Sequence, residues 1–209
     1  MQRRSNQVEF PTLPPLDRLS GVSLMVARGN LRTSALDFRS SVFDKEQGTE
    51  GLDEFDQHAA QLVACEEGQI VAAARFVDPE QRPFGLERYF DLCAHVGQRE
   101  RIGELSRYCL REDWREITRG TFLHLGMLKL ALEYSRSHRV TSIVGSVQPR
   151  FRPLYRRVHF RPIGQTFQHP VFGDTTIMLL DLANMWSDKL GRHPLRALLD
   201  DPRVPGVTL

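Results

Sequence analysis

The amino-acid sequence predicts an α/β fold, a mixed and twisted sheet with helices on both faces. Short apolar or β-branched runs recur along the chain at the lengths that are typical of strands. Residues 121–137 are apolar nearly all round, which predicts a buried helix. The β-branched run 140–147 follows that helix, so we expect a central strand that is parallel to the strand before the helix.

The N-terminal elements are predicted from proline and glycine residues, which interrupt helices and strands, and from a residue that can cap a helix. Residues 1–21 include a proline-rich stretch and are expected to be an extended lead-in. The apolar run 22–27 predicts a strand, and Asn30 is a suitable cap for a helix over residues 31–42. Residues 43–51 are polar and contain glycine, which predicts a loop.

The middle of the chain predicts three more strands. The runs 61–65 and 70–77 flank Glu-Glu-Gly, which indicates an antiparallel hairpin. A short helix is expected over residues 84–93, because a proline precedes it. Residues 103–110 have the composition of another strand, and the charged residues 111–120 predict a loop before the long helix.

The C-terminal part predicts a strand pair behind a basic segment. Residues 149–158 are expected to be a basic helix or loop, and the runs 160–167 and 171–182 form a closing hairpin. Residues 186–209 predict a tail that begins helical and ends in proline-rich coil. The sequence thus predicts one domain over residues 22–185.

The composition is that of an ordinary globular chain. Of the 209 residues, 41% are hydrophobic and 26% are charged, a balance that allows a sizeable core. The start is polar and basic without a secretory pattern, and no segment approaches the roughly 20 apolar residues of a membrane span. The three cysteines are scattered and lack metal-ligand spacing. We therefore expect a cytoplasmic protein with no metal and no stable membrane insertion.

Positive charge is concentrated in one part of the chain. Residues 134–173 contain seven arginines and no acidic residue. Arginine binds phosphates and carboxylates as a planar fork, so the cluster indicates nucleic acid, an acidic protein or a phosphate group, unless it is only a solvated basic face. No RNA-binding motif or recognition helix accompanies it, so we do not expect nucleic acid.

A series of spaced residues gives the sharper functional signal. The series is Arg39-x-x-x-Phe43, Asp53-Glu54-Phe55-Asp56, Arg75 and Glu104-Leu105-Ser106-Arg107. In order and spacing it resembles the autoinducer-synthase branch of the GNAT-like acyltransferases, which includes acyl-homoserine-lactone synthases and long-chain N-acyl amino acid synthases. The resemblance implies a GNAT-like sheet that is splayed between two central parallel strands.

These residues suggest how an amino acid could be held. Three arginines and three carboxylates can fix the two charges of a zwitterion, whereas a structural ion-pair network is the equal alternative for Arg39 and Asp56. The acceptor ammonium must lose a proton before it attacks, which suits Glu104 as general base, the role that the resemblance also implies. The candidate substrate-binding residues are Arg39, Phe43, Asp53, Asp56, Arg75, Arg107, Ser106 and Ser146.

The strand that carries Glu104 is expected to contain a β-bulge within residues 105–108. In a regular strand Glu104 and Arg107 would point to opposite faces. A bulge would bring both to one side and free backbone N–H groups for an oxyanion. Ser106 and Ser146 are small residues that could leave room for an acyl tunnel where the central strands separate.

Two further features concern the acyl donor. Tyr155-x-x-x-His159-Phe160 resembles the close of the GNAT donor motif, which makes Tyr155 a candidate acid for the leaving thiolate, or else a packed tyrosine. In the turn before the long helix, Thr118 replaces a glycine of coenzyme-A enzymes, so the turn suits a single phosphate better than pyrophosphate. We therefore expect the acyl-phosphopantetheine of acyl carrier protein as donor. The candidate docking residues are Arg115, Arg119, Arg150, Arg152, Arg156 and Arg157.

These features predict an N-acyltransferase that moves a long-chain acyl group from acyl carrier protein to an amino acid, with no permanently bound cofactor. The resemblance to N-acyltyrosine synthases alone gives tyrosine as the expected acceptor. The nearest alternative is an acyl-homoserine-lactone synthase that uses S-adenosylmethionine, although the Trp and Glu of those enzymes are replaced near Thr49 and Gly51. A non-catalytic binding module of the same fold is the other alternative.

Overall fold

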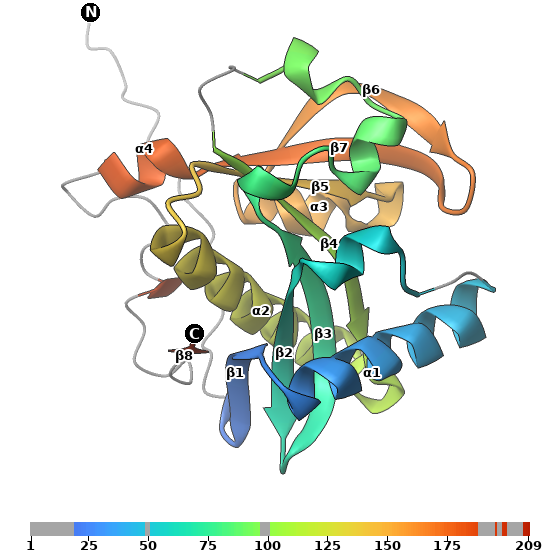
Figure 1. Cartoon of the computed structure of the whole chain (residues 1–209), viewed down its shortest axis with the longest axis vertical. Coiled ribbons are helices and arrows are strands. Elements are labelled where there is room, and N and C mark those ends of the chain that lie inside the picture. Colours follow the sequence, from blue (N-terminus) through green and yellow to red (C-terminus); the bar gives the residue numbers. More distant parts are fainter. Residues whose placement is uncertain (1–18, 49–50, 97–100, 188–194, 196–197, 200–206) are drawn as a thin grey trace, which may run out of the picture.

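The structure, a computed structural model, describes residues 19–48, 51–96, 101–187, 195, 198–199 and 207–209 (Figure 1). These residues form a sheet of eight strands in the order β6-β7-β5-β4-β3-β2-β1-β8. The strands are β1 (Val22–Ala27), β2 (Ala60–Glu66), β3 (Gln69–Val77), β4 (Ile102–Leu110), β5 (Ser142–Val147), β6 (Arg161–His169), β7 (Gly173–Asp181) and β8 (Val207–Thr208). The helices are α1 (Asn30–Gln47), α2 (Ile117–Ser137), α3 (Arg152–Arg157) and α4 (Leu182–Ser187). Short 3₁₀ helices cover Glu54–Gln57, Pro79–Gln81, Gly85–Arg88, Leu92–Ala94, Glu112–Trp114 and Pro149–Phe151.

The predicted α/β fold and its central parallel pair are confirmed. β4 and β5 run parallel, whereas the pairs β1–β2, β2–β3, β3–β4, β5–β7 and β6–β7 are antiparallel. The β4–β5 ladder runs from Ile102↔Ser142 to Glu104↔Val144 and stops there, although both strands continue. The sheet therefore opens between its two central strands beyond Glu104, as predicted.

α2 covers one face of the sheet and α1 covers the other (Figure 1). On the α2 face, Leu24 and Leu62 pack into an apolar cluster with the buried side of the helix. On the α1 face, Val63 and Ala73 pack with Ala35 of the helix. Neighbouring strand residues thus point to opposite faces, as the pleat of a strand requires. α2 is buried along most of its length, which explains its nearly uniform apolar sequence.

β4 contains the expected β-bulge. Between the pairs Arg75↔Ser106 and Ala73↔Cys109, β4 has one residue more than β3. Arg107 lies within this extra length and has a positive φ of 55°. A left-handed residue of this kind accommodates the added residue of a bulge. The prediction of a bulge in this strand is therefore confirmed.

The predicted limits of α1 are wrong at both ends. The helix does not end at residue 42 but continues to Gln47, because Phe43 lies on its buried face. Gly48 ends the helix in the left-handed conformation, which glycine adopts without strain. Asn30 is the first helical residue and not the cap, which is Gly29.

Three other expectations are corrected by the structure. Residues 84–93 do not form one helix, because Asp91 accepts the Ala94 N–H and starts a second 3₁₀ segment. α2 begins at Ile117, inside the region that was expected to be a loop. The final residues include β8, which pairs in parallel with β1 where coil was expected.

The two ends of the chain are described only in part. Residues 1–18 of the expected lead-in lie outside the described residues, as do 188–194, 196–197 and 200–206 of the expected tail. Leu19, at the end of the expected lead-in, is fully buried in the cluster on the α2 face. Among the residues that the structure describes, no helix has the length and apolar character needed to cross a bilayer.

Candidate active site

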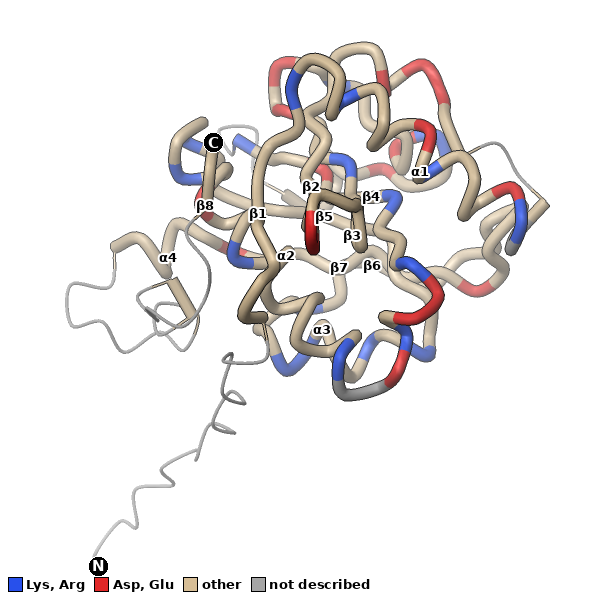
Figure 2. Tube along the Cα trace, turned by 90° about the horizontal axis from the view of Figure 1, so that it is seen from below, with Lys and Arg blue, Asp and Glu red and all other residues tan. Residues whose placement is uncertain are grey.

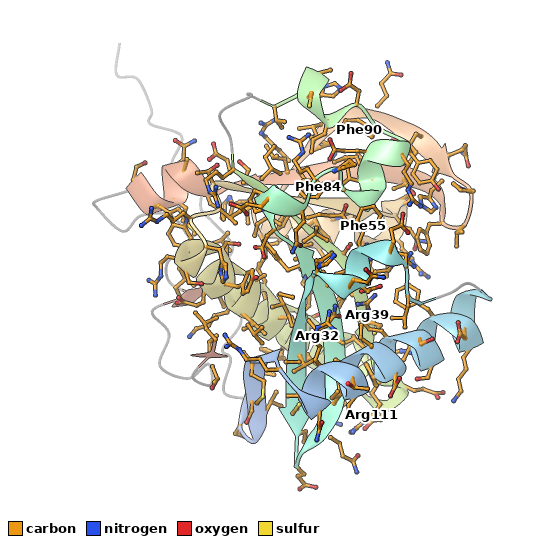
Figure 3. All side chains as sticks on the ribbon, viewed as in Figure 1. Arg32, Arg39, Phe55, Phe84, Phe90 and Arg111 are labelled. Atoms are coloured by element: carbon orange, nitrogen blue, oxygen red, sulfur yellow. The ribbon has the colours of Figure 1, made fainter. Side chains whose placement is uncertain are left out.

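Arg39 of α1, which Figure 3 labels, forms an ion pair with Asp56 that is sealed between the helix and the sheet. Arg39 is 0% exposed, and its guanidinium donates to both Asp56 oxygens at 2.7 Å and 3.2 Å. Gln61 accepts another bond from Arg39 at 2.5 Å, and the Gly51 carbonyl accepts one at 2.9 Å. Burial alone would raise the pKa of Asp56, but the bonds from Arg39 hold it below its usual value. The sealed pair fits the structural alternative for Arg39 and Asp56, although the buried Arg39 Nε has no hydrogen-bond partner among the described residues.

Arg75 of β3 links this pair to the rest of the charged cluster. It is 2% exposed and is ion-paired with Asp53. Its guanidinium also lies 3.4 Å from Asp56 Oδ2 and 3.4 Å from Glu104 Oε1. Its Nε donates to the Ser106 hydroxyl at 3.1 Å. One buried arginine therefore joins β4 to the turn that carries the two aspartates.

The charged cluster is accessible to solvent at Asp53 and Arg107. Their side chains are 18% and 20% exposed, and their ion pair is 3.0 Å long. Asp53 is held in place because it caps a 3₁₀ helix, accepting the Phe55 N–H at 3.0 Å. The Arg107 guanidinium lies over the Phe43 ring, 5.4 Å from its centroid. All six predicted charges therefore meet, and Asp53 and Arg107 are the partly exposed members of the cluster.

Glu104 lies where the sheet begins to open. It is 3% exposed and is the last β4 residue that pairs with β5. Its carboxylate accepts the Leu86 N–H at 3.3 Å and lies 3.4 Å from the Arg75 guanidinium. Both distances are long for bonds to a charged group, so the carboxylate keeps acceptor capacity for a further donor.

An apolar pocket lies on the opposite, α2 face of the sheet. Its lining residues are Ala74, Leu105, Tyr108, His124, Met127, Leu128, Tyr155 and Phe160. It holds about 330 Å³ of space outside the protein atoms, including the part that is open to solvent. β4 borders this pocket through Leu105 and Tyr108, whereas Glu104 and Arg107 belong to the charged cluster. β4 therefore contributes to both sites.

Tyr155 of α3 is a polar group of this pocket. Burial raises its pKa to about 12, so its hydroxyl stays protonated near neutral pH. Its ring packs edge-on against Phe160 and His124, with centroids 5.1 Å and 5.4 Å apart. His159, which stands where the donor motif has glycine, has a positive φ of 67°. The backbone conformation that favours glycine is thus present, although the residue is histidine.

Three polar residues of these sites were missed by sequence reasoning. Gln61 is fully buried beside Arg39, and its signal was a polar residue in an apolar strand. Tyr108 and His124 line the pocket with ring centroids 5.1 Å apart. Burial lowers the pKa of His124 to about 4, so the ring is neutral near pH 7. A histidine within an otherwise apolar helix was the available signal.

The two serines that were expected to leave room for an acyl chain lie elsewhere. Ser106 accepts a hydrogen bond from Arg75 in the charged cluster, and Ser146 is exposed on β5. Neither serine belongs to the lining of the apolar pocket. Close approach of the two strands depends on Gly145, where a Cβ atom would lie 2.8 Å from the Leu105 carbonyl oxygen.

The first two candidate docking arginines are engaged by the protein itself. Arg115 donates to the Leu110 carbonyl at 2.8 Å. Arg119 lies 3.7 Å from Glu66 and stacks over the Trp114 ring at 4.3 Å. Both arginines flank the start of α2, where the donor phosphate was expected.

The other four docking candidates gather on the segment that includes α3 (Figure 2). Arg150, Arg156 and Arg157 are exposed, and Arg152 is partly buried. Phe151 within this segment is 45% exposed and is covered on one side by Arg150, 4.7 Å from its ring centroid. The segment therefore presents a basic surface with an apolar side chain in it.

Aromatic side chains stand beside the accessible end of the charged cluster. Burial lowers the pKa of His169 below its usual value, and the positive charge of Arg107 lowers it further. Tyr89 packs against His169 at 4.8 Å and against Phe167 at 6.2 Å. Phe172 stacks on His169 at 4.6 Å. The β6–β7 hairpin and the segment before β4 together form this aromatic wall.

The family model described as N-acyl amino acid synthase FeeM matches residues 38–183, which is more than half of the chain. The matched region contains the whole charged cluster and Tyr155. No curated protein matches the sequence.

Solved structures share the fold. FeeM, an N-acyl amino acid synthase from uncultured soil microbes, has a TM-score of 0.68 at 14% identity, covering 79% of this chain and 92% of that chain. BjaI, a CoA-dependent acyl-homoserine lactone synthase, has a TM-score of 0.68 at 18% identity, covering 90% and 93%. The acyl-homoserine lactone synthase LasI has a TM-score of 0.59 at 16% identity, covering 77% and 90%. These likenesses show the GNAT-like α/β fold.

Proposed function

Because this chain is an acyltransferase of the N-acyl amino acid synthase FeeM family, we propose that it acylates the amine of an amino acid in the cytoplasm. The donor in this proposal is a long-chain thioester of acyl carrier protein, the acceptor is tyrosine, and residues 22–185 form the catalytic domain. The observation that carries the proposal is the position of Glu104 at the opening between β4 and β5. A charged cluster lies on one side of this opening and an apolar pocket on the other.

The charged cluster suits the acceptor. Its carboxylate would pair with Arg107, and its ammonium would lie between Asp53 and Glu104. Glu104 removes one proton from the ammonium, which gives the nitrogen the lone pair that it needs for attack. The amine then attacks the thioester carbon through the opening, forming the C–N bond and an oxyanion. Backbone N–H groups of β4 that no longer pair with β5 can donate to this oxyanion.

The thiolate leaving group is stabilised by a residue that lines the apolar pocket. When the tetrahedral intermediate collapses, the C–S bond breaks and the nitrogen gives up its second proton, which converts the thiolate to the thiol. Tyr155 has a pKa of about 12, above that of a thiol near 8.5, so it donates a hydrogen bond and does not lose its proton. In this mechanism Tyr155 stabilises the thiolate, and Glu104 releases the first proton to solvent.

The surface around α3 supports acyl carrier protein as the donor. Arg150, Arg156 and Arg157 are exposed on the same short segment as Tyr155, which lines the pocket. An acidic protein that docks on these arginines would bring its phosphopantetheine arm to the pocket. The exposed ring of Phe151 offers an apolar contact at the centre of that surface.

The aromatic wall supports an aromatic acceptor. His169, on which Tyr89 packs, is electrostatically coupled to Arg107, which would hold the acceptor carboxylate. A tyrosine in that position could stack its ring on the wall, an arrangement worth about 0.5–1.5 kcal/mol beyond area burial. An aliphatic amino acid would lose this contribution.

Product mass tests the proposal directly. The purified protein is incubated with long-chain acyl carrier protein and an equimolar mixture of amino acids, and the amides are identified by mass spectrometry. We expect N-acyltyrosine as the main product, and a lower rate when the same acyl group is presented on coenzyme A. A main product with another amino acid would reject tyrosine, and equal use of coenzyme A would reject the carrier-protein preference.

A parallel reaction with S-adenosylmethionine as the acceptor distinguishes the proposed function from that of an acyl-homoserine-lactone synthase. Formation of an acyl-homoserine lactone there would identify a lactone synthase instead. If the folded protein forms no acyl product with any acceptor but binds acyl carrier protein, the chain is a binding module of this fold.

A further inference from the structure

The hydroxyl group of Tyr108 is an exception in the apolar pocket. Its oxygen is buried, yet it has no hydrogen-bond partner among the residues that the structure describes. Tyr108 is one of the residues that line the pocket, and it lies in the β-bulge of β4, so its unpaired hydroxyl is located at the pocket wall. A buried hydroxyl without a partner is unfavourable, because it has lost its bonds to water and gained none.

Tyr108 is one of three polar side chains in a row. His124 packs between Tyr108 and Tyr155, with ring centroids 5.1 Å and 5.4 Å away. The other lining residues are apolar: Ala74, Leu105, Met127, Leu128 and Phe160. Neither Tyr108 nor His124 has a part in the transfer steps above, so the pocket contains polar groups that the reaction does not use.

A saturated acyl chain does not explain these groups. Its methylene groups would be enclosed favourably by the leucines and methionine, but they offer Tyr108 no acceptor. Filling the pocket with such a chain would leave the hydroxyl unpaired and would exclude water as well. A pocket that selected saturated chains would be better lined by phenylalanine at this position.

Building on the proposed acyl transfer, we propose that this pocket selects acyl chains that carry an oxygen atom near the thioester. Tyr108 donates a hydrogen bond to that oxygen. The row runs from Tyr155, which lies beside the sulfur in the proposed mechanism, through His124 to Tyr108, so the oxygen belongs on a carbon in the first part of the acyl chain. The β-carbon meets this condition.

Between the two common oxygen groups, the pocket favours a hydroxyl over a keto group. A hydroxyl accepts from Tyr108 and can also donate to a ring nitrogen of His124, whereas a keto oxygen can only accept. The low pKa of His124, about 4, keeps its ring neutral and leaves one nitrogen able to accept. The expected order of preference is β-hydroxyacyl, then β-oxoacyl, then saturated acyl.

The test compares three acyl carrier protein thioesters of equal chain length, which differ only at the β-carbon. We expect kcat/KM of the wild-type protein to be about 10-fold higher for the β-hydroxyacyl donor than for the saturated donor, the usual effect of one hydrogen bond to a buried group. In Tyr108→Phe the ratio between the two donors should fall close to one. Equal use of the donors by the wild-type protein, or an unchanged ratio in the variant, overturns the inference.

Tyr155→Phe is the matched control, because it removes the other tyrosine hydroxyl of the same pocket. It should lower turnover for all three donors by the same factor, leaving the ratio between donors unchanged. If Tyr155→Phe changes the ratio and Tyr108→Phe does not, the assignment to Tyr108 is wrong.

Two measurements keep this inference separate from the proposed function. Thermal unfolding of unliganded Tyr108→Phe should give a Tm equal to or above that of the wild type, because the variant loses an unpaired hydroxyl. A clear decrease would mean that a water molecule already satisfies Tyr108, and it overturns the inference. Binding of acyl-pantetheine amides, which cannot transfer their acyl group, should show the same order of preference even if no acyl transfer is detected.

Discussion

Glu104 accepts from one arginine and one backbone amide, and the substitution Glu104→Gln keeps its size but removes the charge and leaves a single acceptor oxygen for these two donors. We expect kcat to fall by about 10² to 10⁴, the usual contribution of a positioned base, with little change in the fold. The measurement is the pH–rate profile of both proteins with a saturating amino acid. An unchanged rate across the pH range would remove Glu104 from the role of base.

His124 should make the folded protein sensitive to acid. Its pKa is about 4 in the folded chain against an ordinary 6.5, so between these values the unfolded chain binds a proton that the folded chain does not. The free energy of unfolding therefore falls as the pH decreases from 6.5 toward 4 and is fully restored above 6.5. We expect this loss to be on the order of 2 kcal/mol between pH 7 and pH 4.5.

His124→Phe isolates this effect, because phenylalanine keeps the ring contacts with Tyr108 and Tyr155 but cannot titrate. Urea unfolding at pH 7 and pH 4.5 should show a smaller loss in the variant than in the wild type. Other histidines titrate in both proteins and cancel in the comparison. The same loss in both proteins would show that the His124 ring is not shielded from solvent.

The identity of the charged site residues could be predicted from the sequence, whereas their burial and their neutral hydrogen-bond partners could not. The spaced arginines and carboxylates were identified from the sequence because their order and types match a known series, and all six meet in the structure. Which of them are sealed could not be predicted, because the burial of Arg39 depends on Gln61 and on a carbonyl from another segment. Tyr108 and His124 come together only through packing of α2 on β4.

At the scale of elements, Gly145 controls how closely β4 and β5 approach at the point where they part. In Gly145→Ala the new Cβ would lie 2.8 Å from the Leu105 carbonyl oxygen, closer than real contacts allow. The strands must shift, and we expect the free energy of unfolding to fall by about 1–3 kcal/mol. Urea unfolding measures this loss, and kcat/KM should fall as well because the opening changes shape.

Gly85→Ala is the control for the loss of a glycine without a clash. A Cβ there would meet Phe55 at 3.6 Å, which is ordinary contact. We expect its free energy of unfolding to change by less than that of Gly145→Ala. Equal effects of the two substitutions would show that the distance at Gly145 is not the cause.

The elements themselves were largely predictable because strands and the long helix follow the periodicity of apolar residues. The limits of α1 were not, since Phe43 is apolar but is followed by polar residues that suggested a loop. The bulge could be predicted because two functional residues at odd spacing needed to share one face. Nothing in the local sequence indicates β8, whose pairing with β1 joins the two ends of the described chain.

At the scale of the whole molecule, the basic surface around α3 should act on the rate of encounter with an acidic donor protein. In a variant with Arg156→Glu and Arg157→Glu we expect KM for acyl carrier protein to rise at low salt and to return toward the wild-type value as salt rises. The reason is that screening shortens the reach of charge to about 3 Å at 1 M salt. Steady-state kinetics at two salt concentrations measure this change.

The matched control reverses Arg136, in the last turn of α2, and Arg139, in the connection from α2 to β5. Both belong to the same acid-free stretch, but they precede β5, whereas α3 follows it. This variant has the same net charge as the first. An equal rise in KM would assign the effect to overall charge, and normal use of the carrier protein by the α3 variant would show that docking occurs elsewhere.

The opening beyond Glu104 has a consequence for the order of events in a catalytic cycle. The charged cluster and the apolar pocket lie on opposite faces of the sheet, so under the proposed function either substrate can enter while the other is bound. No intermediate in which the enzyme itself carries the acyl group is then required, and a ternary complex should precede any product. Double-reciprocal plots of initial rate against donor concentration, at several fixed acceptor concentrations, should give lines that intersect. Parallel lines would mean that the acyl group is first transferred covalently to the protein.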